Sequence, residues 1–122
     1  MSEAETSESS ASKSEPSEAK ALYKAGFARF VKGDSEGAIS CYREAIASDE
    51  SLAIAWNGLS MALASQGALE AAIEAAEKLV ELEPDDPLSH TNLSRILMQN
   101  GQIPEAEDAR AKAMGLQMKG GS

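Results

Sequence analysis

The residue types that could support catalysis or metal binding are few in this 122-residue sequence, and they stand apart from one another. A single imidazole, His90, could act as a general base, but the spacing places no acid, base or nucleophile with it. A single thiol, Cys41, would need an activating neighbour to be reactive. We therefore interpret His90 as a core or boundary side chain and Cys41 as a small buried hydrophobe. The sequence predicts no catalytic residue, no metal site and no cofactor.

Charge is a second feature with chemical consequences. The chain carries 20 acidic and 11 basic side chains, which argues against a nucleic-acid or anionic membrane surface. No apolar run reaches the roughly 18 residues of a membrane span, so we expect no membrane insertion. One acidic stripe has helical spacing: Glu70, Glu74, Glu77 and Glu81. Such a stripe is typical of a solvated outer face, and it could alternatively dock a basic partner.

An internal repeat sets the elements that must position these side chains. Glycines recur every 34 residues, at Gly33, Gly67 and Gly101. Five residues after each glycine stands an alanine: Ala38, Ala72 and Ala106. The spacing defines three blocks of equal length: 19–52, 53–86 and 87–120. Within each block, apolar residues three and four apart predict two amphipathic helices of about 14 residues, with the glycine at the turn between them.

Local signals predict where several helices begin and end. Asp86 followed by Pro87 is typical of an N-cap and a first helical residue. Ser51 and Ser17 are predicted N-caps of two earlier helices. Pro84 is a natural stop for the helix before it, because its ring removes a donor and clashes with the preceding turn.

The repeat resembles the tetratricopeptide repeat, a 34-residue helix–turn–helix with preferred Trp, Leu, Gly, Tyr, Ala, Phe and Pro positions. The second block matches at Trp56, Leu59, Ala72 and Pro84, and departs at Ser60, Leu63 and Ala76. The first block matches at Gly26, Ala38 and Tyr42, and the third at Leu93 and Ala106. The resemblance implies an all-α fold, a right-handed α-solenoid of three helix–turn–helix repeats. In that family the first helices line a concave groove and the second helices lie outside.

In this phase, the groove-facing positions are the second, fifth, ninth and twelfth of each block. They hold Lys20, Tyr23, Phe27 and Phe30, then Ile54, Asn57, Met61 and Ala64, then Leu88, Thr91, Arg95 and Met98. Tyr23, Phe27 and Phe30 form an aromatic stripe, although some of these rings, Phe30 above all, could instead complete the core. The pattern predicts an apolar groove with adaptable Met contacts and cationic rims, suited to an extended peptide or an amphipathic helix.

One branch of the family clamps the acidic C-terminal tails of heat-shock chaperones with Lys, Asn and Arg side chains at fixed positions. At those positions this sequence holds Tyr23, Phe27, Gly58, Leu88 and Asn92. The clamp is therefore absent, and a chain of net charge −9 would gain little from an acidic ligand. We predict no binding of acidic chaperone tails.

The two ends of the chain differ from its middle. Residues 1–17 are rich in Ser and Glu and are predicted to be a disordered acidic tail, so the repeat domain is expected over 18–116. In the last block, Glu107 and Arg110 stand where earlier blocks have packing residues, as a terminal repeat requires. Residues 117–122 are expected to be frayed.

These features predict a non-enzymatic protein–protein interaction module, a scaffold, adaptor or chaperone-like domain that binds a peptide or helix of a partner protein. The alternative is a structural unit that self-associates into a homo-oligomer, through the groove or through the Met114–Met118 edge. The single cysteine and the acidic N-terminus, which has no apolar leader, favour a cytoplasmic location.

Overall fold

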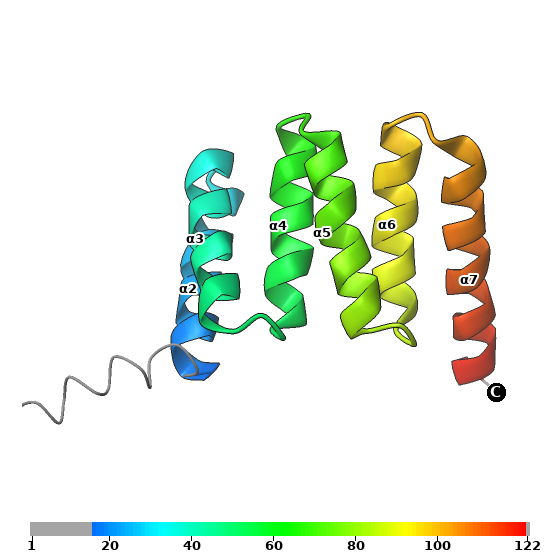
Figure 1. Cartoon of the computed structure of the whole chain (residues 1–122), viewed down its shortest axis with the longest axis horizontal. Coiled ribbons are helices and arrows are strands. Elements are labelled where there is room, and N and C mark those ends of the chain that lie inside the picture. Colours follow the sequence, from blue (N-terminus) through cyan, green and yellow to red (C-terminus); the bar gives the residue numbers. More distant parts are fainter. Residues whose placement is uncertain (1–15, 122) are drawn as a thin grey trace, which may run out of the picture.

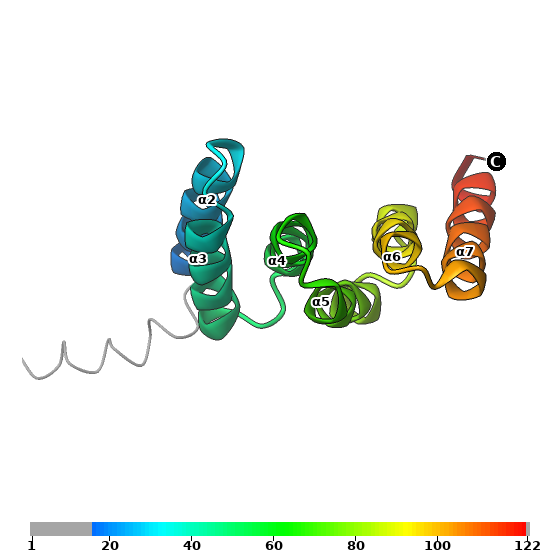
Figure 2. The ribbon, with the colours of Figure 1, turned by 90° about the horizontal axis from the view of Figure 1, so that it is seen from above.

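The computed structural model describes residues 16–121 and folds them into six consecutive α-helices, with no strand in that range (Figure 1). The helices are α2 (Pro16–Val31), α3 (Ser35–Ser48), α4 (Ala53–Ser65), α5 (Leu69–Leu82), α6 (Pro87–Gln99) and α7 (Ile103–Gly121). Seen from above, the pairs form a row in which α4 and α6 lie on one side and α5 on the other (Figure 2). The predicted all-α solenoid of three helix pairs is confirmed.

The turn inside each helix pair depends on its glycine. The φ angles of Gly33, Gly67 and Gly101 are +90°, +82° and +79°, in the left-handed region that a Cβ atom disfavours. A Cβ atom added at any of the three would meet no atom within 4 Å. The backbone conformation, rather than close packing, therefore explains why glycine recurs every 34 residues.

Two of the helices begin with an aspartate cap. The side chain of Asp34 accepts a hydrogen bond from the Gly37 amide at 2.9 Å, and that of Asp86 accepts one from the Leu88 amide at 3.0 Å. Pro87 is the first residue of α6, as predicted. These caps satisfy amides that the first turn of a helix leaves without partners.

The two predicted serine caps are wrong. Ser51 donates from both its amide and its hydroxyl to the Asp49 carboxylate, at 3.0 and 2.7 Å. The cap position of α4 falls one residue later, at Leu52, which makes no side-chain cap. Ser17 lies inside the first turn of α2, because that helix already begins at Pro16.

Small side chains hold the two helices of each pair together. The alanines that follow the turn glycines, Ala38, Ala72 and Ala106, are all fully buried. Seven residues further along the same helices, Ala45, Leu79 and Ala113 are also buried. Larger side chains at the alanine positions would force the paired helices apart, since packed interiors tolerate little added volume.

The interface between the first two repeats is built around Tyr42 of α3. Its ring is 1% exposed and lies against the backbones of Gly26 in α2 and Gly58 in α4. A Cβ atom at Gly58 would lie 2.7 Å from Cζ of the ring, and one at Gly26 would lie 2.8 Å from Cδ1. Both glycines are therefore needed for the close approach of the ring. Burial raises the pKa of Tyr42 to about 12.

The interface between the second and third repeats fills the equivalent space differently. Ala76 takes the place of Tyr42, and Ser60 and Asn92 take the places of the two glycines. The Asn92 amide nitrogen donates to the Ser60 hydroxyl at 2.8 Å, and both residues are buried. No partner is found for the buried amide oxygen of Asn92 within the described residues. The hydrogen-bonded pair of Ser60 and Asn92 thus stands where the first interface has the buried Tyr42 ring.

The last repeat exposes the positions that earlier repeats bury. Glu107 and Arg110 are exposed, and the Met114 side chain is 46% exposed. Helix α7 continues to Gly121, so the structure has a helix where the sequence predicted a frayed end from residue 117. At the other end, α2 begins before the predicted domain start at residue 18, and most of the predicted tail, residues 1–15, lies outside the described chain.

Candidate functional site

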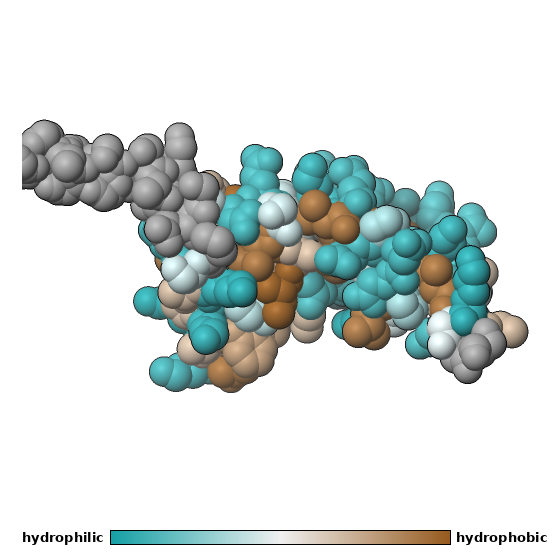
Figure 3. Space-filling model, turned by 90° about the horizontal axis from the view of Figure 1, so that it is seen from below, coloured by the Kyte–Doolittle hydropathy of each residue, from teal (hydrophilic) through white to brown (hydrophobic). Residues whose placement is uncertain are grey.

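The residues that the sequence predicts to line a groove lie on α2, α4 and α6, and we call the side of these helices that carries them the inner face. Its large hydrophobic side chains are exposed: Phe27 by 50%, Ile54 by 46%, Leu88 by 67% and Met98 by 41%. Viewed from the end at which α2, α4 and α6 begin, the molecule shows separate hydrophobic patches between hydrophilic side chains (Figure 3). The inner face therefore offers apolar contacts from all three repeats.

The aromatic stripe on α2 divides between core and surface. Tyr23 stacks on Phe27, with ring centroids 6.2 Å apart, and on the buried Tyr42 at 5.6 Å. Tyr23 and Phe30 are half-buried against the hydrophobic core, and burial raises the pKa of Tyr23. Phe27 is the ring of the stripe that is exposed. Tyr23, like Phe30, therefore packs partly against the hydrophobic core.

The side chains in the central part of the inner face are less exposed. Asn57 and Met61 of α4 are half-buried, and the equivalent position to Phe30, Ala64, is buried. A hollow of about 400 Å³ opens between the first turns of α4 and α6, where Ile54 and Leu88 stand on its two sides. Lys20, at the equivalent place on α2, is exposed.

A second hollow, of about 570 Å³, lies at the C-terminal end of the row. It joins three predicted residues of α6, Thr91, Arg95 and Met98, to residues of α7 that the sequence prediction did not include: Arg110, Ala113, Met114 and Gln117. Arg110 lies 3.7 Å from the Glu107 carboxylate. The sequence predicted from Glu107 and Arg110 that this is the terminal repeat. It did not show that α7 lies beside Thr91, Arg95 and Met98 of α6, which only the fold reveals.

His90 and Cys41, the two side chains considered for chemistry, are both at least half-buried. His90 is 7% exposed, and its Nε2 lies 2.7 Å from the Pro84 carbonyl oxygen. Cys41 is half-buried, less enclosed than predicted. Within residues 16–121, no group of three His, Cys, Asp or Glu side chains could hold a metal ion. No helix in that range is both long and apolar enough to cross a membrane.

The positions that carry the acidic-tail clamp in the resembling family cannot present such a clamp here. Gly58 lies beneath the Tyr42 ring, and Asn92 is 3% exposed and bonded to Ser60. Tyr23 and Phe27 stack on each other. These positions therefore present no cationic side chain on the inner face.

Comparison with known proteins identifies the repeat. Two family models described as tetratricopeptide repeat match residues 23–87 and 63–113. No curated protein matches the chain significantly.

Solved structures share its architecture. A crystal structure of MamA is 28% identical with a TM-score of 0.80, over 84% of this chain and 60% of that one, so this chain spans about three fifths of MamA's length. The Yersinia enterocolitica type III secretion translocator chaperone SycD is 20% identical (TM-score 0.78; 84% of this chain, 76% of that one). The first repeat domain of Spaghetti, bound to an HSP90 peptide, is 16% identical (TM-score 0.81; 84% and 82%).

Proposed function

Since this chain belongs to the tetratricopeptide repeat family, we propose that it is a non-enzymatic module that binds a peptide or helix of a partner protein on its inner face. The observation that carries the proposal is the exposure of Phe27, Ile54, Leu88 and Met98 along three consecutive first helices. Leaving such side chains in water is unfavourable, and a row of them is typical of an interaction surface. Solved relatives of the same fold include one that is bound to a peptide.

The chemistry of the inner face suits an apolar segment with few charges. Met61 and Met98 are flexible and adapt to different partner side chains. Lys20 and Arg95 are exposed at opposite ends of the face and suit acidic residues at the ends of the segment. Because Gly58 and Asn92 are buried, we propose that acidic chaperone tails are not its ligands.

The test is capture of partners from native lysate with the wild-type chain and the double variant Phe27→Ala, Leu88→Ala. Both side chains are at least half exposed, so their loss should leave the fold intact. If they are hot spots, their joint removal weakens binding at least tenfold. The control is Ile103→Ala, which removes a hydrophobic side chain of α7 that is 45% exposed. Equal capture by the control and by the double variant would contradict the proposal.

A second candidate function is self-association into a homo-oligomer. It is favoured by the open hollow between α6 and α7 and by the exposure of Met114 and Met118, by 46% and 73%. Light scattering over a range of concentrations separates the two functions. A mass that stays at 12.8 kDa excludes the oligomer, whereas a rising mass that Met114→Ser with Met118→Ser abolishes supports it.

A further inference from the structure

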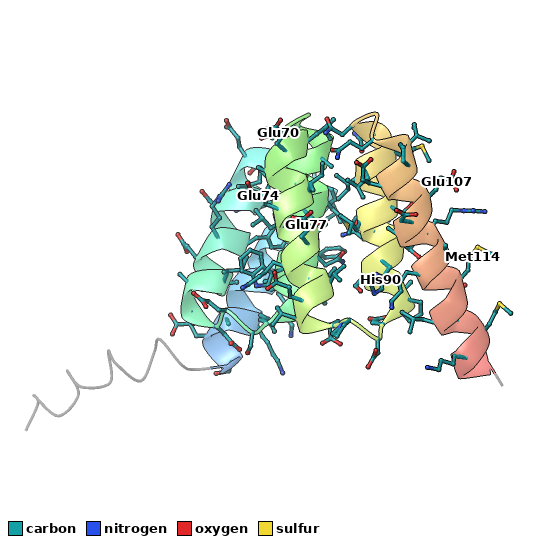
Figure 4. The ribbon with its side chains drawn as sticks, turned by 45° about the vertical axis from the view of Figure 1, so that its right-hand side comes forward. Glu70, Glu74, Glu77, His90, Glu107 and Met114 are labelled. Carbon is teal, nitrogen blue, oxygen red and sulfur yellow. The ribbon has the colours of Figure 1, made fainter. Side chains whose placement is uncertain are left out.

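Two equivalent crevices open on the outer side of the solenoid, opposite the inner face. The α3–α5 crevice, about 280 Å³, lies above Trp56 and Leu59 of α4. The α5–α7 crevice, about 390 Å³, lies above His90 and Leu93 of α6. Each has an apolar floor from a first helix and two walls from neighbouring second helices. The acidic stripe of α5 runs along the wall between them (Figure 4).

The charges that line the two crevices differ. In the α3–α5 crevice, Arg43 and Lys78 stand with Glu74. In the α5–α7 crevice, the position equivalent to Arg43 holds Glu77, and α7 adds Glu105 and Asp108. Among the described residues, no Lys or Arg lines the α5–α7 crevice, and none of its three carboxylates has an ion-pair partner. The charged side chains that line the α3–α5 crevice thus sum to +1, and those that line the α5–α7 crevice sum to −3.

The floor of the acidic crevice adds a second polar group. Trp56 and His90 are equivalent, and each ring bonds to the loop before its helix: Trp56 Nε1 donates to the Glu50 carbonyl at 2.8 Å, and His90 Nε2 lies 2.7 Å from the Pro84 carbonyl. Because that carbonyl can only accept, Nε2 carries the proton, and in the neutral ring Nδ1 is an acceptor. The His90 side chain is 93% buried and lines the floor of the crevice (Figure 4).

We propose that the α5–α7 crevice binds a basic amphipathic peptide segment of a partner protein. An apolar side chain of the segment would rest on Leu93 and Leu97, and its Lys or Arg side chains would reach Glu77 and Asp108 on opposite walls. Lysine and arginine suit such a site because their aliphatic stems cover apolar surface while their heads meet carboxylates. The crevice is separate from the inner face, so this proposal stands or falls independently of the groove.

The structure also divides the acidic stripe that the sequence presented as one unit. Glu74 lines the α3–α5 crevice and Glu77 lines the α5–α7 crevice. Glu81 lies 3.5 Å from the Lys78 ammonium group. A basic partner would therefore use Glu77 together with α7, rather than follow α5 along its length.

The test is titration of the full chain with two synthetic amphipathic peptides of equal length, one of Lys and Leu and one of Glu and Leu. Binding is followed by calorimetry, and its place by amide chemical shifts. The Lys/Leu peptide should shift the signals of Ile73, Leu93 and Leu97, and raising the salt concentration should weaken its binding. The variant Glu77→Gln with Asp108→Asn should weaken it about fivefold or more, with unchanged circular dichroism.

The matched control is Glu50→Gln with Glu74→Gln, which removes the same charge from around the α3–α5 crevice. It should change the affinity by less than about twofold. Equal losses in both double variants would show attraction by net charge alone and refute the site. No binding of the Lys/Leu peptide, equal binding of the Glu/Leu peptide, or shifts confined to the inner face would refute it as well.

Discussion

Because Gly58 lies against the Tyr42 ring, we expect the effect of Gly58→Ala on the free energy of unfolding to change sign with the presence of that ring. Gly58→Ala would place a methyl carbon 2.7 Å from Cζ, whereas carbon atoms in good contact lie about 3.5–4.0 Å apart. Either the ring or α4 must move, and such overpacking costs about 1–3 kcal/mol. Replacing a glycine inside a helix by alanine stabilises the helix by about 1 kcal/mol. The expected net loss in the free energy of unfolding is therefore up to about 2 kcal/mol.

The effect should reverse when the outer atoms of the ring are absent. The ring atoms nearest to the added methyl are Cζ, Cε1 and Cε2, which leucine lacks. In a Tyr42→Leu background, Gly58→Ala should therefore stabilise the chain by up to about 1 kcal/mol, as helix propensity alone predicts. Tyr42→Phe is the control background, because it keeps all three atoms and should keep the destabilisation.

Urea unfolding followed by circular dichroism measures all the free energies that this cycle needs. The interaction energy between positions 42 and 58 should be about 1–3 kcal/mol, within the range that contacting residues show. Tyr42 also stacks on Tyr23, so chemical shifts of Tyr23 and Phe27 should move in Gly58→Ala. A loss of the same size in the Tyr42→Leu background would refute the packing argument.

Three further predictions concern single sites. Gly67→Ala should destabilise the chain by about 1–2 kcal/mol, because φ is +82°, and Gly67→Asn by less; urea midpoints test both. The amide that Asp34 caps and the Arg29 guanidinium lower the pKa of Asp34, so its contribution to stability is present above its unfolded pKa near 4 and is lost as pH falls through the folded value; the acid limb of the stability curve should be shallower in Asp34→Asn. Ser60→Ala should cost about 1–3 kcal/mol alone, because it leaves the Asn92 amide unpaired, but less in an Asn92→Ala background, and a double-mutant cycle measures the difference.

The sequence was sufficient to predict the helix pairs because their signals are local and repeated. A glycine with a left-handed backbone conformation and a buried alanine recur at fixed spacing. The glycine depends only on the turn, and the alanine depends only on the contact between the two helices of a pair. The N-cap of α4 was missed because Ser51 belongs to the preceding turn, where its amide and hydroxyl donate to Asp49, and the cap position falls at Leu52. Competing local partners of this kind cannot be ranked from residue types alone.

Some of the predicted inner-face residues, such as Phe27, are exposed and others, such as Tyr23 and Phe30, are half-buried, and only the fold shows their neighbours. Nothing in the spacing shows that Tyr23 rests on a ring of α3, or that Arg110 stands across a hollow from Arg95. Those relationships depend on how α3 and α7 pack against the first helices, which is a long-range property. The same holds for Glu77 and Asp108, which face one crevice from different repeats.

Positions that are equivalent in the three repeats show where specificity can arise on a shared backbone. One such position holds Tyr42, Ala76 and Arg110. Tyr42 is a buried aromatic ring, Ala76 is a small buried side chain near the Ser60–Asn92 pair, and Arg110 is exposed at the end of the solenoid. Because the backbone is the same, these differences reflect what each side chain meets on the next helix. Arg43 and Glu77 differ in the same way, but both face open crevices, so packing does not constrain their charge. The reversal gives the α5–α7 crevice the negative charge that the proposed basic segment would need, on the outer side of this solenoid rather than on its inner face.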